Sequence, residues 1–426
     1  MTGEELKQSR RLLFMLFVAW GVGFIDVQAV NIASVPMRSE LGLSTIQVGM
    51  AVSGYFLMYS LMTMSSGWFV NHLGVRRALA FIMVAWGLFS GLTGTITSLV
   101  ALLAMRSLLG FTQGGLGGVT SVAIMELFPP EKRGRAKAFQ ASAGSVGVAV
   151  GILFCAAMTQ WFGWRVMFGC FAVVGALLAF LFMTQYKTPH LEKRTVTVHK
   201  QLGLKQAVTN SNAMLLAFIQ FGLGAFMWGL NAWLPSYWVE SKGLDLLHMG
   251  MLSLIPWIVS FVFMNFSSYI LDVYFNGRER YALSAILVIG GLLLYAMLKV
   301  SSIAAGFALL TAVTVLMSIG SATVYMLSMK YMPSEMISSS TGLVLLGQQL
   351  GGVVAPPVMG ALLVWFAGNY DAVFGFVILL VFLGALASLR FNSKKDSVAL
   401  AQPVHSTPSD KAVDFTKRNS RALFIA

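Results

Sequence analysis

Charged residues are scarce in this chain. Only 11% of its 426 residues are Asp, Glu, Lys or Arg, while 57% are hydrophobic. A soluble domain carries about 25% charged residues, so the composition excludes an ordinary water-soluble protein. Long apolar runs recur from end to end, which indicates a polytopic membrane protein rather than a soluble domain with one anchor.

Cysteine and histidine are also rare, and their positions predict no metal site. Cys155 and Cys170 lie inside apolar runs, where cysteines usually act as small apolar side chains. The five histidines map to loops and tails without metal-ligand spacing. The chain has no phosphate-binding loop of the Gly-x-x-x-x-Gly-Lys type and no nucleophile–base arrangement. We therefore expect no cofactor, no ATP-driven step and no enzymatic activity.

The apolar runs divide the chain into twelve predicted membrane-spanning helices. A helix needs about 20 residues to cross a hydrocarbon core of about 30 Å. The first run follows a short charged start and is too long for a signal peptide. The predicted spans are residues 12–35, 46–70, 77–97, 99–126, 136–160, 164–185, 212–239, 247–271, 281–299, 303–329, 338–365 and 371–391.

One connection between these spans is long, and it divides the chain in half. A polar, basic linker at 186–211 separates a first six-helix half, 12–185, from a second, 212–391. Residues 1–11 form a cytoplasmic N-terminus, and 392–426 are polar and predict a disordered cytoplasmic tail. Two repeated halves with a site between them at the middle of the membrane are typical of secondary transporters. The predicted fold class is all-α.

The net charge of +13 could indicate nucleic-acid binding, but its distribution argues against this. With the N-terminus in the cytoplasm, most of the 29 Lys and Arg fall in the termini, the linker and the loops of the cytoplasmic side. The positive-inside rule then places both termini in the cytoplasm. The basic residues add a modest attraction to anionic lipid, and we expect no nucleic-acid partner.

Two opposite charges stand deep in the first half. Asp26 in span 1 and Arg106 in span 4 lie about 9–10 Å from the outer face, at a rise of about 1.5 Å per residue. A charge at that depth costs about 2.5–3.5 kcal/mol on insertion scales unless it is paired or neutralised, so we expect the two to pair. One reading is a structural salt bridge. The reading we favour is proton coupling, in which protonation of Asp26 frees Arg106 to bind a substrate carboxylate.

Uncharged polar and aromatic side chains at similar depth complete the predicted substrate site. Gln113 lies two helical turns beyond Arg106 and shares its face of span 4. Each candidate could instead make a structural interhelical hydrogen bond, worth about 0.6–2 kcal/mol. The other candidates are Tyr59, Tyr325, Gln348, Gln349, Asn31 and Asn231.

Glycines are concentrated in spans 4 and 5. Gly110 and Gly114 lie in span 4, and Gly144, Gly147 and Gly151 lie in span 5. Small residues allow the backbones of neighbouring membrane helices to approach closely. We expect these glycines to serve helix packing.

Several motifs resemble those of a known family. Two six-helix halves, a central linker and the loop from Gly67 to Arg77 resemble the major facilitator superfamily. Further motifs are similar to those of its anion:cation symporter branch, whose members carry organic anions together with protons. The resemblance implies alternating access by a monomer, with a small organic anion such as a carboxylate and protons as partners. The motifs of the branch are the span 1 carboxylate, Arg106–Gly110, Phe128–Arg133, Trp164–Phe168 and Trp233–Tyr237.

The resemblance also implies a latch on the cytoplasmic side that holds this side shut in the outward-open state. The superfamily usually has Asp then Arg where this chain has Asn71 and His72, so we expect a weaker latch. The latch residues would be Gly67, Asn71, Gly74, Arg76 and Arg77, with Glu126 and Asp272 as acidic partners.

Two departures from the branch keep other functions open. The branch often has Arg directly after the span 1 acid, where this chain has Val27, and Glu where it has Gln113. A facilitator or proton antiporter for a neutral or cationic compound is therefore an alternative. A transporter-like sensor that signals through its tail is another. Short loops favour a bacterial inner membrane.

Overall fold

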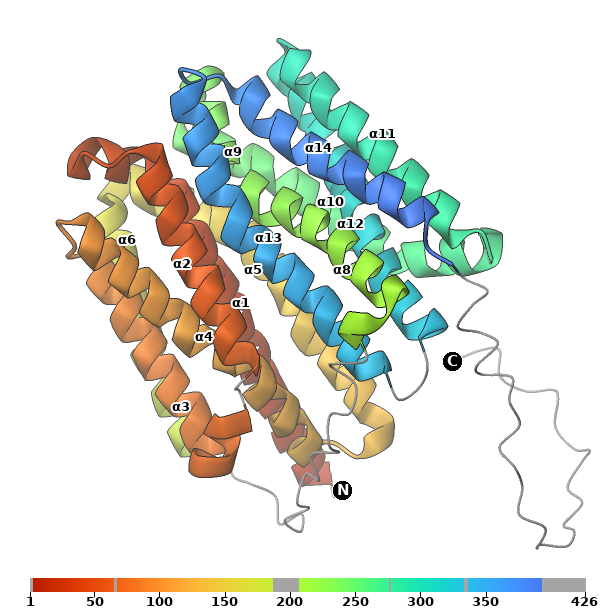
Figure 1. Cartoon of the computed structure of the whole chain (residues 1–426). Coiled ribbons are helices and arrows are strands. Elements are labelled where there is room, and N and C mark those ends of the chain that lie inside the picture. Colours follow the sequence, from red (N-terminus) through yellow and green to blue (C-terminus); the bar gives the residue numbers. More distant parts are fainter. Residues whose placement is uncertain (1–2, 65–66, 187–206, 276, 333–335, 393–426) are drawn as a thin grey trace, which may run out of the picture.

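The structure is a computed structural model that describes residues 3–64, 67–186, 207–275, 277–332 and 336–392 (Figure 1). Most of the predicted linker and nearly all of the predicted tail lie outside these residues. The first half contains α1 (Gly3–Leu41), α2 (Thr45–Met64), α3 (Gly67–Thr93), α4 (Leu99–Leu127), α5 (Pro130–Phe162) and α6 (Trp164–Gln185). The second half contains α8 (Ser211–Gly224), η1 (Ala225–Gly229), α9 (Leu230–Ser236), η2 (Tyr237–Ser241), α10 (Leu246–Tyr274), α11 (Glu279–Lys299), α12 (Ile303–Tyr331), α13 (Ile337–Trp365) and α14 (Tyr370–Leu389).

The helices have the length and apolarity of membrane spans. Over the described residues, eleven helical segments meet both conditions, and the Leu246–Ser260 part of α10 is a shorter apolar helix. The chain segments from α8 to η2 form one continuous span, Ser211–Ser241. The positions agree with the twelve spans predicted from the apolar runs.

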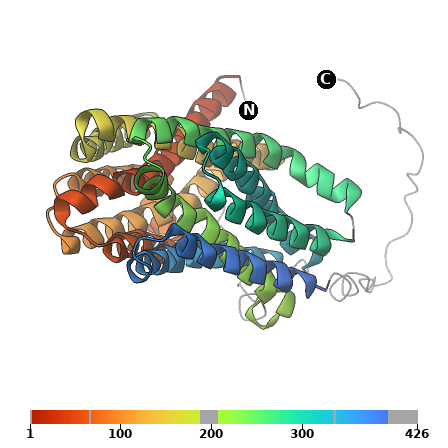
Figure 2. The ribbon, with the colours of Figure 1, turned by 90° about the horizontal axis from the view of Figure 1, so that it is seen from above.

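The two halves repeat one packing order. In the first half α1 packs on α5, α2 on α4 and α3 on α6. In the second half α8 packs on α13, α10 on α12 and α11 on α14, so each pair has a counterpart. The red-to-yellow half and the green-to-blue half stand side by side in both views (Figures 1 and 2). This repetition is the two-half architecture that the sequence predicted.

Contact between the halves is made mainly by α2 on α13 and by α5 on α10. Gly49 of α2 lies against Pro357 of α13, where a Cβ on the glycine would come within 2.7 Å of the proline Cα. Ser53 Oγ donates to the Val353 carbonyl at 2.5 Å. Because Pro357 has no N–H, this carbonyl has no intrahelical donor. The other half of the molecule thus supplies the hydrogen bond that the proline removes.

Polar contacts join the halves at the distal end of the bundle, where α1 ends and α2 begins. Arg38 of α1 forms an ion pair with Glu240 of η2. Thr45 Oγ1 donates to the Gly360 carbonyl at 2.9 Å. At α10, the Leu247 backbone N–H donates to Gln160 Oε1 at 2.9 Å. These contacts close the distal end.

The break between spans 2 and 3 falls at Gly74. Span 2 was expected to continue to Val70 and to be followed by a loop, and residues 65 and 66, between α2 and α3, lie outside the described part. The φ of 69° at Gly74 divides α3 into a short first piece and a long second piece, four residues after the expected end of span 2. Glycine adopts this left-handed conformation without the steric cost that a Cβ imposes, so the break falls there.

Span 7 contains two π-helical turns that the sequence did not predict. They are η1 and η2, and they flank α9, which holds Pro235. π-turns are rare and occur often at functional sites. Here η1 carries Trp228 beside the interior cavities, and η2 carries Glu240 at the distal end.

Candidate functional site

Asp26 and Arg106 meet inside the first half. The two side chains come from α1 and α4, and their residues are 0% and 2% exposed. Arg106 Nη1 lies 4.0 Å from Asp26 Oδ2. The predicted pair is therefore present in the structure as a buried ion pair.

Neighbouring helices hold this ion pair in place. From α3, Ser90 Oγ donates to Asp26 Oδ1 at 2.5 Å. Arg106 Nη2 donates to Thr93 Oγ1 at 3.3 Å, and its guanidinium Cζ lies 5.3 Å from the ring centre of Phe168 in α6. Asp26 Oδ2 and Arg106 Nε have no hydrogen-bond partner. The hydrogen-bonding capacity of the pair is thus not fully used. A proton could bind Asp26 Oδ2, and another anion could accept a hydrogen bond from Arg106 Nε.

The contribution of α3 to this pair was missed by sequence reasoning. Ser90 and Thr93 are both fully buried although they are polar. They stand three residues apart, so they share one helix face. This spacing of two polar residues was the feature of the sequence that could have indicated a polar face on α3.

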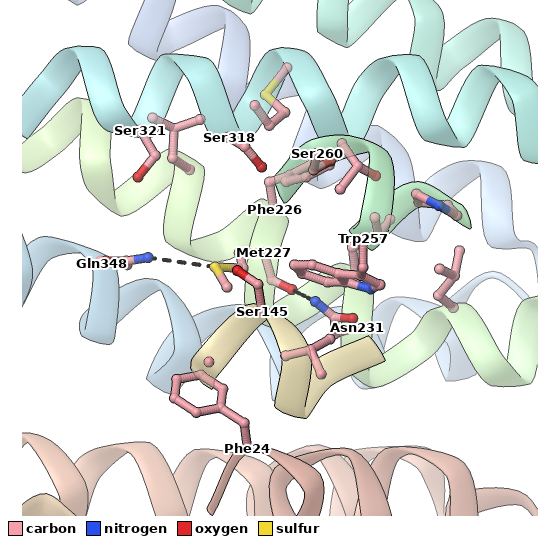
Figure 3. Close-up of a pocket in the computed structure, with 18 of the residues that line it drawn as sticks. Phe24, Ser145, Phe226, Met227, Asn231, Trp257, Ser260, Ser318, Ser321 and Gln348 are labelled. Atoms are coloured by element: carbon pink, nitrogen blue, oxygen red, sulfur yellow. Dashed lines mark hydrogen bonds between the residues drawn. The ribbon is translucent and has the colours of Figure 1, made fainter. Parts of the chain in front are cut away.

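A central cavity of about 300 Å³ lies between the halves (Figure 3). Both halves line it: α1 and α5 from the first, and the span 7 segments, α10, α12 and α13 from the second. Its apolar wall includes Phe24, Phe226 and Trp257. Its polar groups are hydroxyls and amides, from Ser145, Asn231, Ser253, Ser260, Thr314, Ser318, Ser321, Tyr325 and Gln348.

A smaller side cavity of about 60 Å³ borders the central one. Phe24 lines both cavities and stands between them. The hydroxyl of Tyr55 donates to Gln113 Oε1 in its wall. Its lining residues are Trp20, Gly23, Phe24, Val27, Tyr55, Phe56, Tyr59, Gln113, Leu116, Trp228 and Gln349.

Six of the predicted substrate residues line these cavities. Tyr325, Gln348 and Asn231 line the central cavity, and Tyr325 donates to Gln348 Oε1 at 2.9 Å. The other three line the side cavity. They are Tyr59, Gln113 and Gln349.

Arg106 and Asn31 line neither cavity. Asn31 is buried and donates to Gln28 Oε1 at 3.4 Å within α1. Arg106 is enclosed by Asp26, α3 and Phe168. Tyr55 lines the side cavity, whereas Arg106 does not. The expected direct access of Arg106 to substrate is therefore not realised in this conformation. No Lys or Arg is among the described residues that line either cavity.

Close helix packing by glycine positions the site. A Cβ on Gly110 of α4 would overlap the Tyr55 carbonyl of α2, and a Cβ on Gly147 of α5 would overlap the Gly21 carbonyl of α1. At Gly151, a Cβ would lie 2.8 Å from the Ile25 Cα. The packing role expected for these glycines is confirmed.

The predicted latch has a different bonding pattern. Glu126 accepts a hydrogen bond of 2.8 Å from the Tyr186 hydroxyl. Arg76 donates to the Met183 carbonyl. Burial, and then the Glu126 carboxylate, raise the pKa of the Tyr186 phenol, so the hydroxyl keeps the proton that it donates.

The partnership of Glu126 with the loop arginines, expected for the outward-open state, is not formed in this conformation and stays a prediction. Among the described residues, no ion pair joins Glu126 to Arg76 or Arg77. Gly67 and Gly74 begin and interrupt α3. The side chains of Asn71 and Asp272 lie outside the described part.

Comparison with known proteins places these features in a family context. The sequence model described as Major Facilitator Superfamily matches residues 12–356. A protein of Cupriavidus necator named "Probable sulfoacetate transporter SauU" is 24% identical over 410 residues, covering 91% of this chain and 95% of the relative. The "Hexuronate transporter" of Bacillus subtilis is 25% identical over 316 residues, covering 72% of this chain and 74% of the relative.

Solved structures share the fold. A bacterial homologue of the human lysosomal transporter Spinster, in an inward-facing and unoccupied conformation, has a TM-score of 0.71 at 16% identity, covering 90% of this chain and 94% of its own. A D-xylose–proton symporter has a TM-score of 0.70 at 16% identity, covering 90% and 98%. These likenesses confirm the predicted all-α fold of membrane-spanning helices.

Proposed function

Because the chain belongs to the Major Facilitator Superfamily, we propose that it is a proton-coupled symporter of a small organic anion. It is an integral membrane transporter rather than an enzyme. Two relatives are named for sulfoacetate and hexuronate, which are both organic anions, and this supports the substrate class. The proposed location is a bacterial inner membrane, with both termini in the cytoplasm and the protein acting as a monomer.

The buried ion pair between Asp26 and Arg106 is the observation that carries this proposal. While Asp26 is ionised, it neutralises Arg106 at 4.0 Å. Protonation of Asp26 leaves the guanidinium as an uncompensated buried charge, which costs about 3–5 kcal/mol. An anionic substrate removes that cost by supplying a new partner, so proton and anion are bound together.

Movement of the two halves relative to each other would carry the proton and the anion across the membrane. The distal end is closed by the Arg38–Glu240 ion pair and by the contact of Thr45 with Gly360. With the termini in the cytoplasm, the distal end would face outward and the central cavity would be reached from the cytoplasm. Rocking of the halves about the cavity would then expose the site to the outside.

A second candidate function is carriage of a neutral polar solute without an anionic group. The lining of the central cavity favours it, because the polar groups there are hydroxyls and amides and no described cation reaches the cavity. Such groups suit a polyhydroxylated ligand. In this case the ion pair between Asp26 and Arg106 would couple transport to protons, or would only stabilise the fold, without binding substrate.

Purified protein in liposomes with an internal pH dye tests the proposal. We expect uptake of an organic anion, from a panel of sulfoacetate, D-glucuronate and D-glucarate, to acidify the interior. Asp26→Asn should abolish acidification and uphill uptake yet keep exchange of substrate for substrate, since exchange moves no net proton. Arg106→Gln should lose both uphill uptake and substrate exchange. Asp245→Asn, which removes an exposed carboxylate outside the site, is the matched control.

The possible outcomes separate the two functions. Anion uptake without acidification, in a protein whose Asp26→Asn variant still accumulates substrate, would overturn proton coupling. Uptake of neutral sugars alone would overturn the anion proposal and support the second candidate.

A further inference from the structure

Lys137 lies at one end of the cavity-lining stripe of α5. The residues of α5 that line the central cavity include Ala141, Ser145 and Ile152. Positions four residues apart on a helix stand one above the other on the same face. Lys137 is four residues before Ala141 and eight before Ser145, so it continues this stripe by one turn toward the end of the bundle where the chain begins.

The same end of the cavities is bordered by Trp20 of α1. Trp20 lines the side cavity and lies one turn before Phe24, the residue shared by both cavities. Lys137 Nζ lies 5.6 Å from the centre of the Trp20 ring. The lysine and the tryptophan therefore stand together where both cavities approach the end of the bundle opposite the closed distal end.

Lys137 is held in place by neutral groups. Its Nζ donates to Ser121 Oγ of α4 at 3.1 Å and to Gln140 Oε1 at 2.9 Å. No described carboxylate forms an ion pair with it. An ammonium group has three donors, so one N–H remains for a ligand after these two bonds.

Gln140 provides a second donor beside it. This side chain is fully buried, and its Nε2 has no hydrogen-bond partner. Gln140 does not itself line the central cavity, but it stands four and eight residues before Gly144 and Val148, which do, and so it shares their side of α5. A buried donor without a partner costs about 1–3 kcal/mol, and an anionic oxygen bound at Lys137 would remove this cost.

We propose that Lys137 and Gln140 form an anion-recognition site one helical turn beyond the α5 residues that line the central cavity, which takes the carboxylate or sulfonate group of the substrate. This inference rests on the proposed anion transport and supplies the cation that the cavity lining lacks. Lysine suits the role because its ammonium is a point charge on a flexible stem and accepts several anion geometries. The site receives the anionic group before any contact with Arg106, which is enclosed deeper in the protein in this conformation.

The test compares anions with a neutral analogue of similar size. In proteoliposomes and in detergent-solubilised protein, Lys137→Gln should raise KM and Kd about tenfold for the anion of the sulfoacetate, D-glucuronate and D-glucarate panel that the wild type binds best. Lys137→Arg should restore affinity to within a few fold. Any D-glucose binding should be unchanged. Lys132→Gln removes an exposed cation near the start of the same helix and should leave KM and Kd unchanged. If the effect of Lys137 came from surface charge alone, Lys132→Gln would change these values too.

Each contrary result has a distinct meaning. Anion transport by the wild type with unchanged anion affinity in Lys137→Gln would overturn the role of Lys137 and leave the proposed function standing. A lowered Tm with equal loss for anion and neutral sugar would make Lys137 a structural residue and also overturn the inference. A wild type that binds no anion of the panel would overturn the proposed function and this site together.

Discussion

Tyr55 connects the side cavity with α4. Its hydroxyl donates to Gln113 Oε1, and its ring lies in the wall of the cavity. Gln113 lies two helical turns beyond Arg106 on α4. The hydrogen bond between Tyr55 and Gln113 therefore connects the wall of the side cavity with the helix that carries Arg106.

Removal of the Tyr55 hydroxyl should be costly because its partner is already poorly satisfied. Gln113 Nε2 has no hydrogen-bond partner, so Tyr55→Phe leaves the whole amide without one. We expect a loss of about 1–3 kcal/mol in the free energy of unfolding, seen as a lower Tm in detergent. Tyr59→Phe is the control, since no described hydrogen bond involves the Tyr59 hydroxyl. Equal Tm values for the two variants would contradict this account.

The packing of α5 on α1 sets the geometry of the central cavity. Gly144 faces the ring of Phe24, where a Cβ would lie 3.3 Å from the ring, and Gly147 and Gly151 face the α1 backbone. Because the backbones touch, α5 cannot shift without moving Phe24 and Ser145 in the cavity wall. The dimensions of the cavity thus depend on residues that do not touch a ligand.

One added methyl group at this contact should displace α5. In Gly147→Ala the Cβ would overlap the Gly21 carbonyl oxygen, and such overpacking costs about 1–3 kcal/mol. We expect a lower Tm and reduced transport. Gly169→Ala in α6 is the matched control because nothing lies within 4 Å of a Cβ there. Its Tm should be equal or higher, since Ala is favoured over Gly in a helix by about 0.5–1 kcal/mol. A similar loss in both variants would refute the close-contact explanation.

The distal ion pair should bias the conformational equilibrium of the whole molecule. Arg38 and Glu240 join the two halves, and Glu240 also accepts a hydrogen bond of 2.9 Å from Tyr370. The pair is partly exposed, with side-chain exposures of 14% and 38%. Pairs of this kind contribute about 0.2–1 kcal/mol, so its loss should change the ratio of closed to open molecules by up to about fivefold.

Spin labels at Ser44 and Val364, which border the same groove at the distal end, measure this equilibrium. Glu240→Gln should add a population with a longer distance between the labels. Glu40→Gln is the control, because Glu40 pairs with Arg165 at 2.9 Å inside the first half and does not cross between the halves. An unchanged distance distribution in Glu240→Gln would show that the pair does not hold the distal end closed.

At the scale of the whole chain, apolar runs were sufficient to predict the helices and the two halves. Burial in lipid requires each span to satisfy its own backbone, which makes length and apolarity strong signals. The pairing of Asp26 with Arg106 followed from depth, because both charges needed a partner. Local backbone geometry was less predictable: the π-turns of span 7 and the break at Gly74 depend on φ and ψ values that composition does not report.

Side-chain access was the least predictable property. Arg106 was expected to face substrate, yet α3 and Phe168 enclose it. Lys137 was not among the predicted site residues, although it stands one turn before the cavity-lining residues of α5 and packs on Trp20. Depth along a helix can be counted from the sequence, whereas the direction in which a side chain meets its neighbours depends on how several helices pack together.

The hydrogen bond from Ser53 to Val353 has a consequence for the hydration of the interface between α2 and α13. The Val353 carbonyl depends on the opposite half for its donor, because Pro357 provides none within the helix. When the halves separate, this carbonyl is stripped of its partner in a low-dielectric interface. A water molecule has the size and the donor to replace the serine hydroxyl there. Separation of α2 from α13 would therefore favour the entry of water beside Val353, which links opening of this interface to its hydration.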